Sequence, residues 1–142
     1  MGCEGCQLGR ASGVEAGLLC PFLTREEAPG TLLARAGQPV ERVWYVRAGV
    51  VAASREDAGD PVEAPQQVHL PGSFVGLECL THDRSQWTAR ALTRAVLCSA
   101  TVEGFHSWLI QSGERFAFVD RLWRAWPAWR DRGGPVPAAP PR

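Results

Sequence analysis

The sequence lacks lysine altogether, and it has little net charge and no long apolar run. All 15 of its basic residues are arginine, and 15 acidic residues balance them to a formal charge of +0. Proteins that coat nucleic acid carry a basic excess, so this balance argues against that function. No apolar stretch approaches the ~18 residues that cross a bilayer, and the polar first residues do not resemble a secretory signal. We therefore expect a cytoplasmic protein without membrane contact.

Histidines are few, and they give little support for an enzyme. His69, His82 and His106 are scattered along the chain, and no motif pairs any of them with a nucleophile. The 142 residues suit a single domain, and the hydrophobic content of 45% is that of a globular protein. We expect a folded protein that is not an enzyme.

The five cysteines are an odd number, so they do not form a complete disulfide framework. In a reducing cytosol, cysteines are more often metal ligands or free thiols. Cys3 and Cys6 form a C-x2-C pair in a glycine-rich segment that has no core to fill, and Cys20 follows in LLCPFL. Cys79 and Cys98 have apolar neighbours, where a free cysteine also serves as a small core residue. The residues alone leave metal ligation and core packing open.

Most of the chain has the pattern of short β-strands. Glycines in the first twenty residues work against regular structure there. Further on, runs of Val, Leu, Tyr and Trp are separated by Gly and Pro, as strands are. The AG in VWYVRAGVV indicates a hairpin or a tight turn, and REDAGDPVEAP indicates an exposed loop. Short strands at this spacing favour a sandwich or roll. The predicted strand regions are 31–37, 43–54, 66–76 and 87–102.

The period of the apolar residues changes near residue 102, where spacings of three and four predict helices over 102–111 and 113–126. Pro127 ends the second helix after about four turns. Isolated helices of that length are marginal, so the apolar face must be covered by the β-domain, a second copy or another protein. This predicted interface face consists of Phe116, Val119, Leu122, Trp123 and Trp126.

Three stretches together resemble the β-roll sensor domain of Crp/Fnr regulators: GTLLARAGQPVERVWYVRAGVVAASRE, HLPGSFVGLECL and the strands up to FHSWL. The resemblance implies a mainly β fold, a double-stranded β-helix or jelly roll of the cyclic-nucleotide-binding-domain type, with a cysteine-bearing N-terminal arm and one C-terminal α-helix. The expected parts are a cysteine-bearing arm (1–20), a β-roll sensor domain (21–112), a dimer or partner helix (113–130) and a disordered Pro-rich tail (131–142).

Within that family the chain looks most like the oxygen-responsive FNR branch. LPGSFVGLE resembles that branch's LPGDLVGFD, and counting forward without a gap brings Cys98 onto its central cysteine. LLCPF resembles its LCIPF, which aligns Cys20 with the last N-terminal ligand, although the gap from Cys6 is longer here. The resemblance implies an oxygen-labile [4Fe–4S] cluster shielded by Leu19. Four thiolates also suit zinc, which is the alternative. The implied ligands are Cys3, Cys6, Cys20 and Cys98.

Cyclic-nucleotide receptors of the same family have a phosphate site that can be compared with this sequence. Their site needs a Gly-Glu pair in a turn and an Arg-Ser/Thr-Ala run on the next strand. The chain has GL at 76–77 and SQW at 85–87, although Glu78 and Arg84 lie close by. A pocket without its bidentate arginine loses most of its affinity for phosphate. We therefore expect no cyclic-nucleotide binding.

The implied function is redox or oxygen sensing in transcription regulation. The residues from Pro127 to Arg142 are too few for a helix-turn-helix, so we expect no direct DNA binding. Signalling would then pass through protein–protein contact, in a homodimer or in a heteromeric complex with a regulatory protein. The alternative is a zinc-bound or metal-free β-roll that serves as an interaction module.

Overall fold

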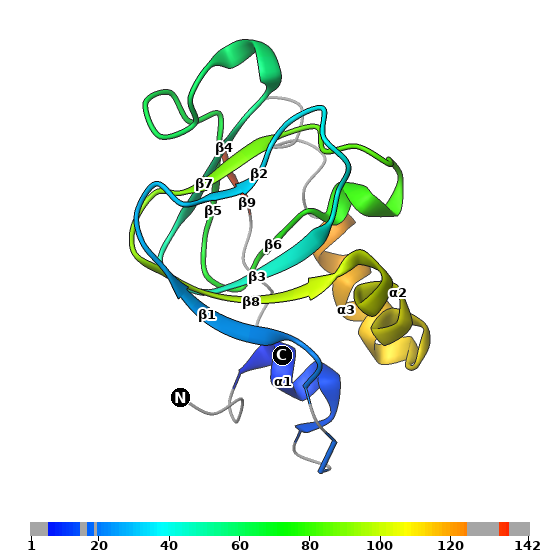
Figure 1. The fold of residues 1–142 in the computed structure, drawn as a ribbon. Helices are drawn as coiled ribbons and strands as arrows, with labels where there is room; N and C mark the ends of the chain where they lie inside the picture. The colour runs from blue at the N-terminus through cyan, green and yellow to red at the C-terminus, as the bar shows by residue number, and fades with distance from the viewer. Residues whose placement is uncertain (1–5, 15–16, 19, 125–133, 137–142) are drawn as a thin grey trace.

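The computed structural model describes residues 6–14, 17–18, 20–124 and 134–136. Two mainly antiparallel sheets form a roll, and α1, α2 and α3 lie against one side of it (Figure 1). No helix in these ranges is long and apolar enough to cross a membrane. The elements are α1 (Gln7–Ser12), β1 (Leu23–Glu27), β2 (Leu32–Ala34), β3 (Arg42–Ala48), β4 (Val51–Ser54), the 3-10 helix η2 (Glu56–Ala58), β5 (Gln67–His69), β6 (Phe74–Val75), the 3-10 helix η3 (Leu77–Leu80), β7 (Thr88–Ala91), β8 (Ala95–Thr101), α2 (Val102–Ile110), α3 (Gly113–Arg124) and β9 (Gly134–Val136).

The two sheets have the orders β1-β8-β3-β6 and β2-β7-β4-β5-β9. In the first sheet β3 and β8 are antiparallel, with Tyr45 opposite Cys98 and Val46 opposite Leu97. Successive side chains of a strand point to opposite faces, so these two pairs face opposite ways. Val46 and Leu97 belong to the roll core, which consists of Val46, Val51, Ala53, Val75, Trp87, Ala89, Ala91, Ala95 and Leu97. The predicted mainly β roll is confirmed.

The other face of the first sheet is covered by the helices. Tyr45 and Cys98 lie there in a second cluster, called the outer core below. Aromatic rings hold it together, with centroids 5.2 Å apart for Phe22 and Trp108 and 6.0 Å apart for Phe74 and Phe118. The outer core consists of Leu8, Ala11, Phe22, Val43, Tyr45, Phe74, Leu77, Cys98, Ala100, Phe105, Trp108, Leu109, Phe118, Val119 and Leu122.

The predicted interface face of α3 is divided between the interior and the surface. Val119 and Leu122 are buried in the outer core of the same chain, whereas Phe116 is 62% exposed. Trp126 lies outside the described residues, and the side chain of Trp123 is also not among those described. The β-roll therefore covers part of this face, and the role of the face in an interface stays a prediction.

The AG segment at 48–49 is a corner between the sheets, so the predicted hairpin was wrong and the predicted tight turn was right. β3 and β4 pair with other strands and lie in different sheets. Gly49 has φ +83, and a Cβ there would lie 2.7 Å from the Ala95 Cα. The twisting roll needs a sharp change of direction here, and only a residue without a side chain fits beside β8.

Two segments predicted to be irregular contain regular structure. Residues 7–12 of the cysteine-bearing arm form α1, which buries Leu8 and Ala11 and ends at Gly13 with φ 84. Residues 134–136 of the predicted disordered tail form β9, which pairs in parallel with β5. Burial against α2 and α3 stabilises α1. Pairing with the free backbone of an edge strand stabilises β9. Local composition encodes neither of these contacts.

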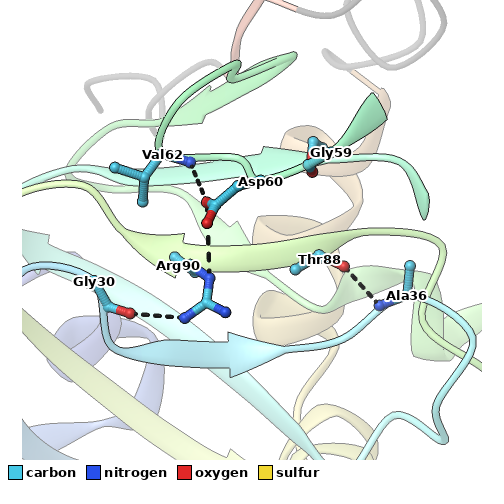
Figure 2. A network of polar contacts seen from close by, with 8 residues as sticks. Gly30, Ala36, Gly59, Asp60, Val62, Thr88 and Arg90 are labelled. Atoms are coloured by element: carbon cyan, nitrogen blue, oxygen red, sulfur yellow. Dashed lines mark hydrogen bonds and ion pairs between the residues drawn. The ribbon is translucent and has the colours of Figure 1, made fainter. Parts of the chain in front are cut away.

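The loop predicted over 55–65 is held against the roll by Arg90 of β7 (Figure 2). Arg90 Nη1 donates to the Gly30 carbonyl at 3.0 Å, and Arg90 Nε lies 3.8 Å from Asp60 Oδ1. Asp60 Oδ1 also accepts a hydrogen bond from the Val62 amide at 2.9 Å. The guanidinium thus connects the turn before β2 to the loop after β4.

Replacing Gly49 by Ala should destabilise the fold strongly, because the methyl group meets the backbone of β8. Gly30→Ala is the matched control, since Gly30 has φ +87 but nothing within 4 Å of the added Cβ. We expect ~1–2 kcal/mol for Gly30→Ala from backbone strain alone, and at least ~2 kcal/mol more for Gly49→Ala from overpacking. Equal losses in urea unfolding would contradict the close approach at Gly49.

Candidate functional site

Three cysteines from separate segments lie on the helix-covered face of the first sheet. Cys98 is on β8, Cys6 is the N-cap residue of α1, and Cys20 precedes β1. Cys98 is 2% exposed within the outer core, and Cys6 and Cys20 are partly buried against the same core. Figure 1 shows α1 lying below β1 and β8, where these segments meet. Cys3 and Leu19 lie outside the described residues.

Cys6 and Cys20 both act on the titration of Cys98. Burial raises the pKa of the Cys98 thiol, and Cys6 and Cys20 raise it further, against the lowering effects of Thr24 and Arg47. Thr24 Oγ1 lies 3.3 Å from Cys98 Sγ. Cys98 is therefore a protonated thiol at neutral pH, and a metal ion that binds it must displace the proton.

Cys20 is connected to the helices through Ser12, which is fully buried. The Ser12 hydroxyl lies 3.6 Å from Cys20 Sγ and donates to the Leu8 carbonyl at 2.9 Å. The same oxygen accepts a hydrogen bond from Trp108 Nε1 at 2.9 Å. The sequence gives no signal for this role of Ser12, because a single serine in a glycine-rich segment has no recognisable pattern.

The donor chemistry of the three thiols fits either an iron–sulfur cluster or zinc. No group of three or more His, Cys, Asp or Glu side chains within the described ranges is arranged to hold a metal ion. The three thiols would have to move together to ligate such a centre. The site therefore has suitable donors, and its metal-binding geometry is not preformed in the described part.

Cys79 is in a different position from the other three. It lies on η3 and is partly buried against the outer core. Burial raises the pKa of its thiol to about 12, and the neighbouring Glu78 adds to the shift. A thiol with so high a pKa is unreactive. This agrees with its interpretation as a core residue or a spare thiol.

A second candidate site lies at the turn after β6. Gly76 takes φ +98 there, and the segment before β7 pairs with the β2–β3 loop through Pro39 and Arg84. Between that loop and the turn is a cavity of about 340 Å³. It includes both charged and apolar side chains. Its lining residues are Leu32, Leu33, Ala34, Arg35, Gln38, Pro39, Val40, Glu41, Arg42, Trp44, Gly76 and Glu78.

Glu78 is the buried carboxyl group of this cavity. Burial raises its pKa, while its backbone amide, the Ser85 hydroxyl and His82 partly oppose the shift. Ser85 Oγ donates to Glu78 Oε1 at 3.2 Å. The carboxyl group therefore takes up a proton more readily than an exposed glutamate does, and it costs free energy to ionise.

Comparison with known families identifies this arrangement. The family model of the cyclic nucleotide-binding domain matches residues 24–112, well over half of the chain. The chain belongs to the cyclic nucleotide-binding domain family. The match supports the resemblance at the level of this domain and does not extend to the FNR branch. A comparison with curated proteins gave no match.

Solved structures of related fold include regulatory subunits of a cAMP-independent protein kinase A. The one from Trypanosoma brucei aligns with a TM-score of 0.61 and 19% identity, over 78% of this chain and 39% of that chain. The one from Trypanosoma cruzi, bound to guanosine, gives the same values. A structure of PKAR CBD2 with bound Sp-2Cl-cAMPS aligns with a TM-score of 0.60 and 13% identity, over 78% and 68%. At these identities the similarity shows the fold alone, and this chain spans 39% of the two trypanosome chains.

In this cyclic nucleotide-binding domain, the segment that should anchor a phosphate has other contacts. Trp87 is buried in the roll core with the Arg55 guanidinium 4.9 Å from its ring centroid. Arg84 is exposed and donates to the Gly37 carbonyl at 2.9 Å. One guanidinium nitrogen of Arg84 is thus engaged by the β2–β3 loop.

Replacing Glu78 by Gln should stabilise the protein increasingly as pH rises. The folded wild-type protein keeps Glu78 protonated at pH values above the ordinary pKa of a glutamate. Its stability therefore falls as pH rises through the raised pKa of Glu78. In E78Q the side-chain amide oxygen still accepts the hydrogen bond from Ser85. The amide does not ionise, so no charge has to be buried. We expect a gain of about 1 kcal/mol at pH 8 relative to pH 5 in urea unfolding. The exposed Glu41→Gln is the control, and an equal pH effect in both variants would contradict the assignment.

Proposed function

We propose that this chain is a redox-responsive regulatory domain in which four cysteines hold a [4Fe–4S] cluster shielded by Leu19. The supporting observations are that Cys98 lies in the outer core, that Cys6 and Cys20 pack against this core from two other segments, and that both act on the pKa of Cys98. Core packing alone does not require three thiols in one place. Four thiolates are the usual ligands of such a cluster, and zinc is the alternative. Cys3 is the fourth ligand in this proposal.

The spacing of the cysteines favours the cluster over zinc. Structural zinc sites often use two C-x2-C hooks, and this chain has one hook, at Cys3 and Cys6, with two isolated cysteines. A bound cluster supplies an oxidation-sensitive crosslink between the N-terminal segment and the roll. Without it, the six-residue α1 depends on packing and hydrogen bonds alone, and helices this short have little stability of their own. Gain and loss of the crosslink would order and release α1.

We propose that the output is a protein–protein contact on the helices. Among the described apolar side chains, Ile110 is 86% exposed at the end of α2 and Phe116 is 62% exposed on α3. α1 contacts α3 directly, so a change in the order of α1 reaches this surface. A second copy or a regulatory protein is the proposed partner. The formal charge of +0 gives no electrostatic basis for direct DNA binding.

Protein purified without oxygen should be brown, with broad visible absorption that bleaches in air and about four iron atoms per chain. The Cys98→Ser variant should lose the metal and keep the fold, because the hydroxyl replaces the thiol without changing the volume much. Cys79→Ser is the control and should keep full metal content. Colourless protein with one zinc ion per chain would contradict the cluster and support the zinc alternative. Full metal content in Cys98→Ser would contradict the proposed ligand set.

A second candidate function is nucleoside or cyclic-nucleotide binding at the cavity beside Gly76 and Glu78. Its supporting observations are the family match and a volume of about 340 Å³, within the range of small-molecule sites. One of the similar structures is bound to guanosine, which has no phosphate to anchor. The departures of the sequence from the family's phosphate-binding pattern, GL at 76–77 and SQW at 85–87, make this the weaker candidate.

Calorimetry with cAMP, cGMP and guanosine tests the second candidate. We expect no saturable binding of cAMP or cGMP by the wild-type protein, because its sequence has GL at 76–77 and SQW at 85–87 in place of the Gly-Glu pair and the Arg-Ser/Thr-Ala run that bind phosphate. Saturable binding with a Kd below about 100 μM would establish the nucleotide site instead. Binding of guanosine alone would indicate recognition of the nucleoside without its phosphate.

A further inference from the structure

Arg115 of α3 is a buried cation whose described hydrogen-bond acceptors are all neutral. Its side chain is 7% exposed. Nε donates to the Ala11 carbonyl at 3.0 Å, and Nη2 donates to the Ser12 carbonyl at 2.9 Å. Nη1 donates to the Trp108 carbonyl at 3.2 Å and to Gln111 Oε1 at 2.9 Å. Burying an arginine is costly, so a side chain in this position needs such a set of acceptors.

The acceptors lie at the C-terminal ends of two helices. α1 ends at Ser12, and the amide of Gly13 already serves the carbonyls of Gly9 and Arg10. The carbonyls of Ala11 and Ser12 are not acceptors of the Gly13 amide, and Arg115 donates a hydrogen bond to each of them. A cation is favoured at a helix C-terminus because the exposed carbonyls carry partial negative charge. One guanidinium therefore completes the end of α1 while it also binds the last turn of α2.

Trp108 forms the second part of the same connection. The Arg115 guanidinium lies 5.6 Å from the centroid of its ring, and its Nε1 donates to Ser12 Oγ at 2.9 Å. Ser12 in turn lies 3.6 Å from Cys20 Sγ. The end of α1 and the Cys20 thiol are therefore held by side chains that belong to α2 and α3.

We propose that Arg115 is the positioning residue of the thiol site, and that it makes the order of α1 and the placement of α3 depend on each other. The inference deepens the proposed function, because it names the residue that brings the cysteine-bearing segment to Cys98. A six-residue helix does not persist alone, so the guanidinium and Trp108 stabilise α1 from outside. By thermodynamic reciprocity, whatever fixes α1 also fixes α3.

The test measures alkylation rates of individual cysteines in reduced, metal-free full-length protein, with mass spectrometry of the peptides. Arg115→Met keeps the length of the side chain and removes all its donors. We expect Cys20 and Cys98 to be alkylated about tenfold faster in this variant. Cys79 should keep its wild-type rate, because it lies on η3 and none of the described Arg115 contacts reaches it. Hydrogen exchange over residues 7–12 should rise by a similar factor, while exchange in β3 stays unchanged.

Two further variants separate positioning from general stability. Arg115→Lys keeps the cation at the helix ends and loses the fork, so it should restore part of the protection. The exposed Arg121→Met, on the same helix, should match the wild type. Unchanged rates in Arg115→Met, or equal acceleration of Cys79 with Cys20 and Cys98, would overturn the inference. The readout needs no metal, so selective acceleration in a protein that never binds iron or zinc would sustain the role of Arg115 and refute only the proposed cofactor.

Discussion

Side-chain alternation along β8 is the constraint on which the rest of the structure depends. Ala95 and Leu97 point into the roll core, so Cys98 and Ala100 must point outward. A slip of one residue would exchange these two sets and place the thiol inside the roll. The pairing of Tyr45 with Cys98 fixes the register from β3. The outward face is apolar, and the helices and the N-terminal segment have to cover it.

Coverage of that face brings the N-terminal segment together with α2 and α3. Leu8 of α1, Phe22 before β1 and Phe118 of α3 share one core with Cys98. Within it, buried polar contacts from Ser12 and Arg115 give the packing a defined geometry, because each buried donor or acceptor must find its partner. The same arrangement that fills the outer core thus gathers the thiols. Packing on the outward face of the first sheet therefore both stabilises the fold and positions the thiols of the proposed sensor.

The sequence predicted most of the strands, the roll and both long helices because these follow from apolar periodicity and from glycines such as Gly49 at corners. It did not predict α1, β1 or β9, since all three depend on tertiary contacts that local composition does not encode. For the candidate site, the resemblance selected Cys3, Cys6, Cys20 and Cys98; Cys3 lies outside the described residues, Cys98 lies in the outer core, and Cys6 and Cys20 pack against that core, as Cys79 also does. Arg115 gave no signal, because an arginine on a helix is usually exposed, and its partners lie about a hundred residues away at Ala11 and Ser12.

Intramolecular crosslinking of the reduced, metal-free protein tests the central claim, that thiols from the N-terminal segment meet the roll at Cys98. A short bifunctional thiol reagent should join Cys98 to Cys6 or Cys20 within one chain, and peptide mass spectrometry identifies the linked pair. The account predicts this product in the native protein and its loss in urea. Native protein that yields only single adducts on Cys98 would contradict it.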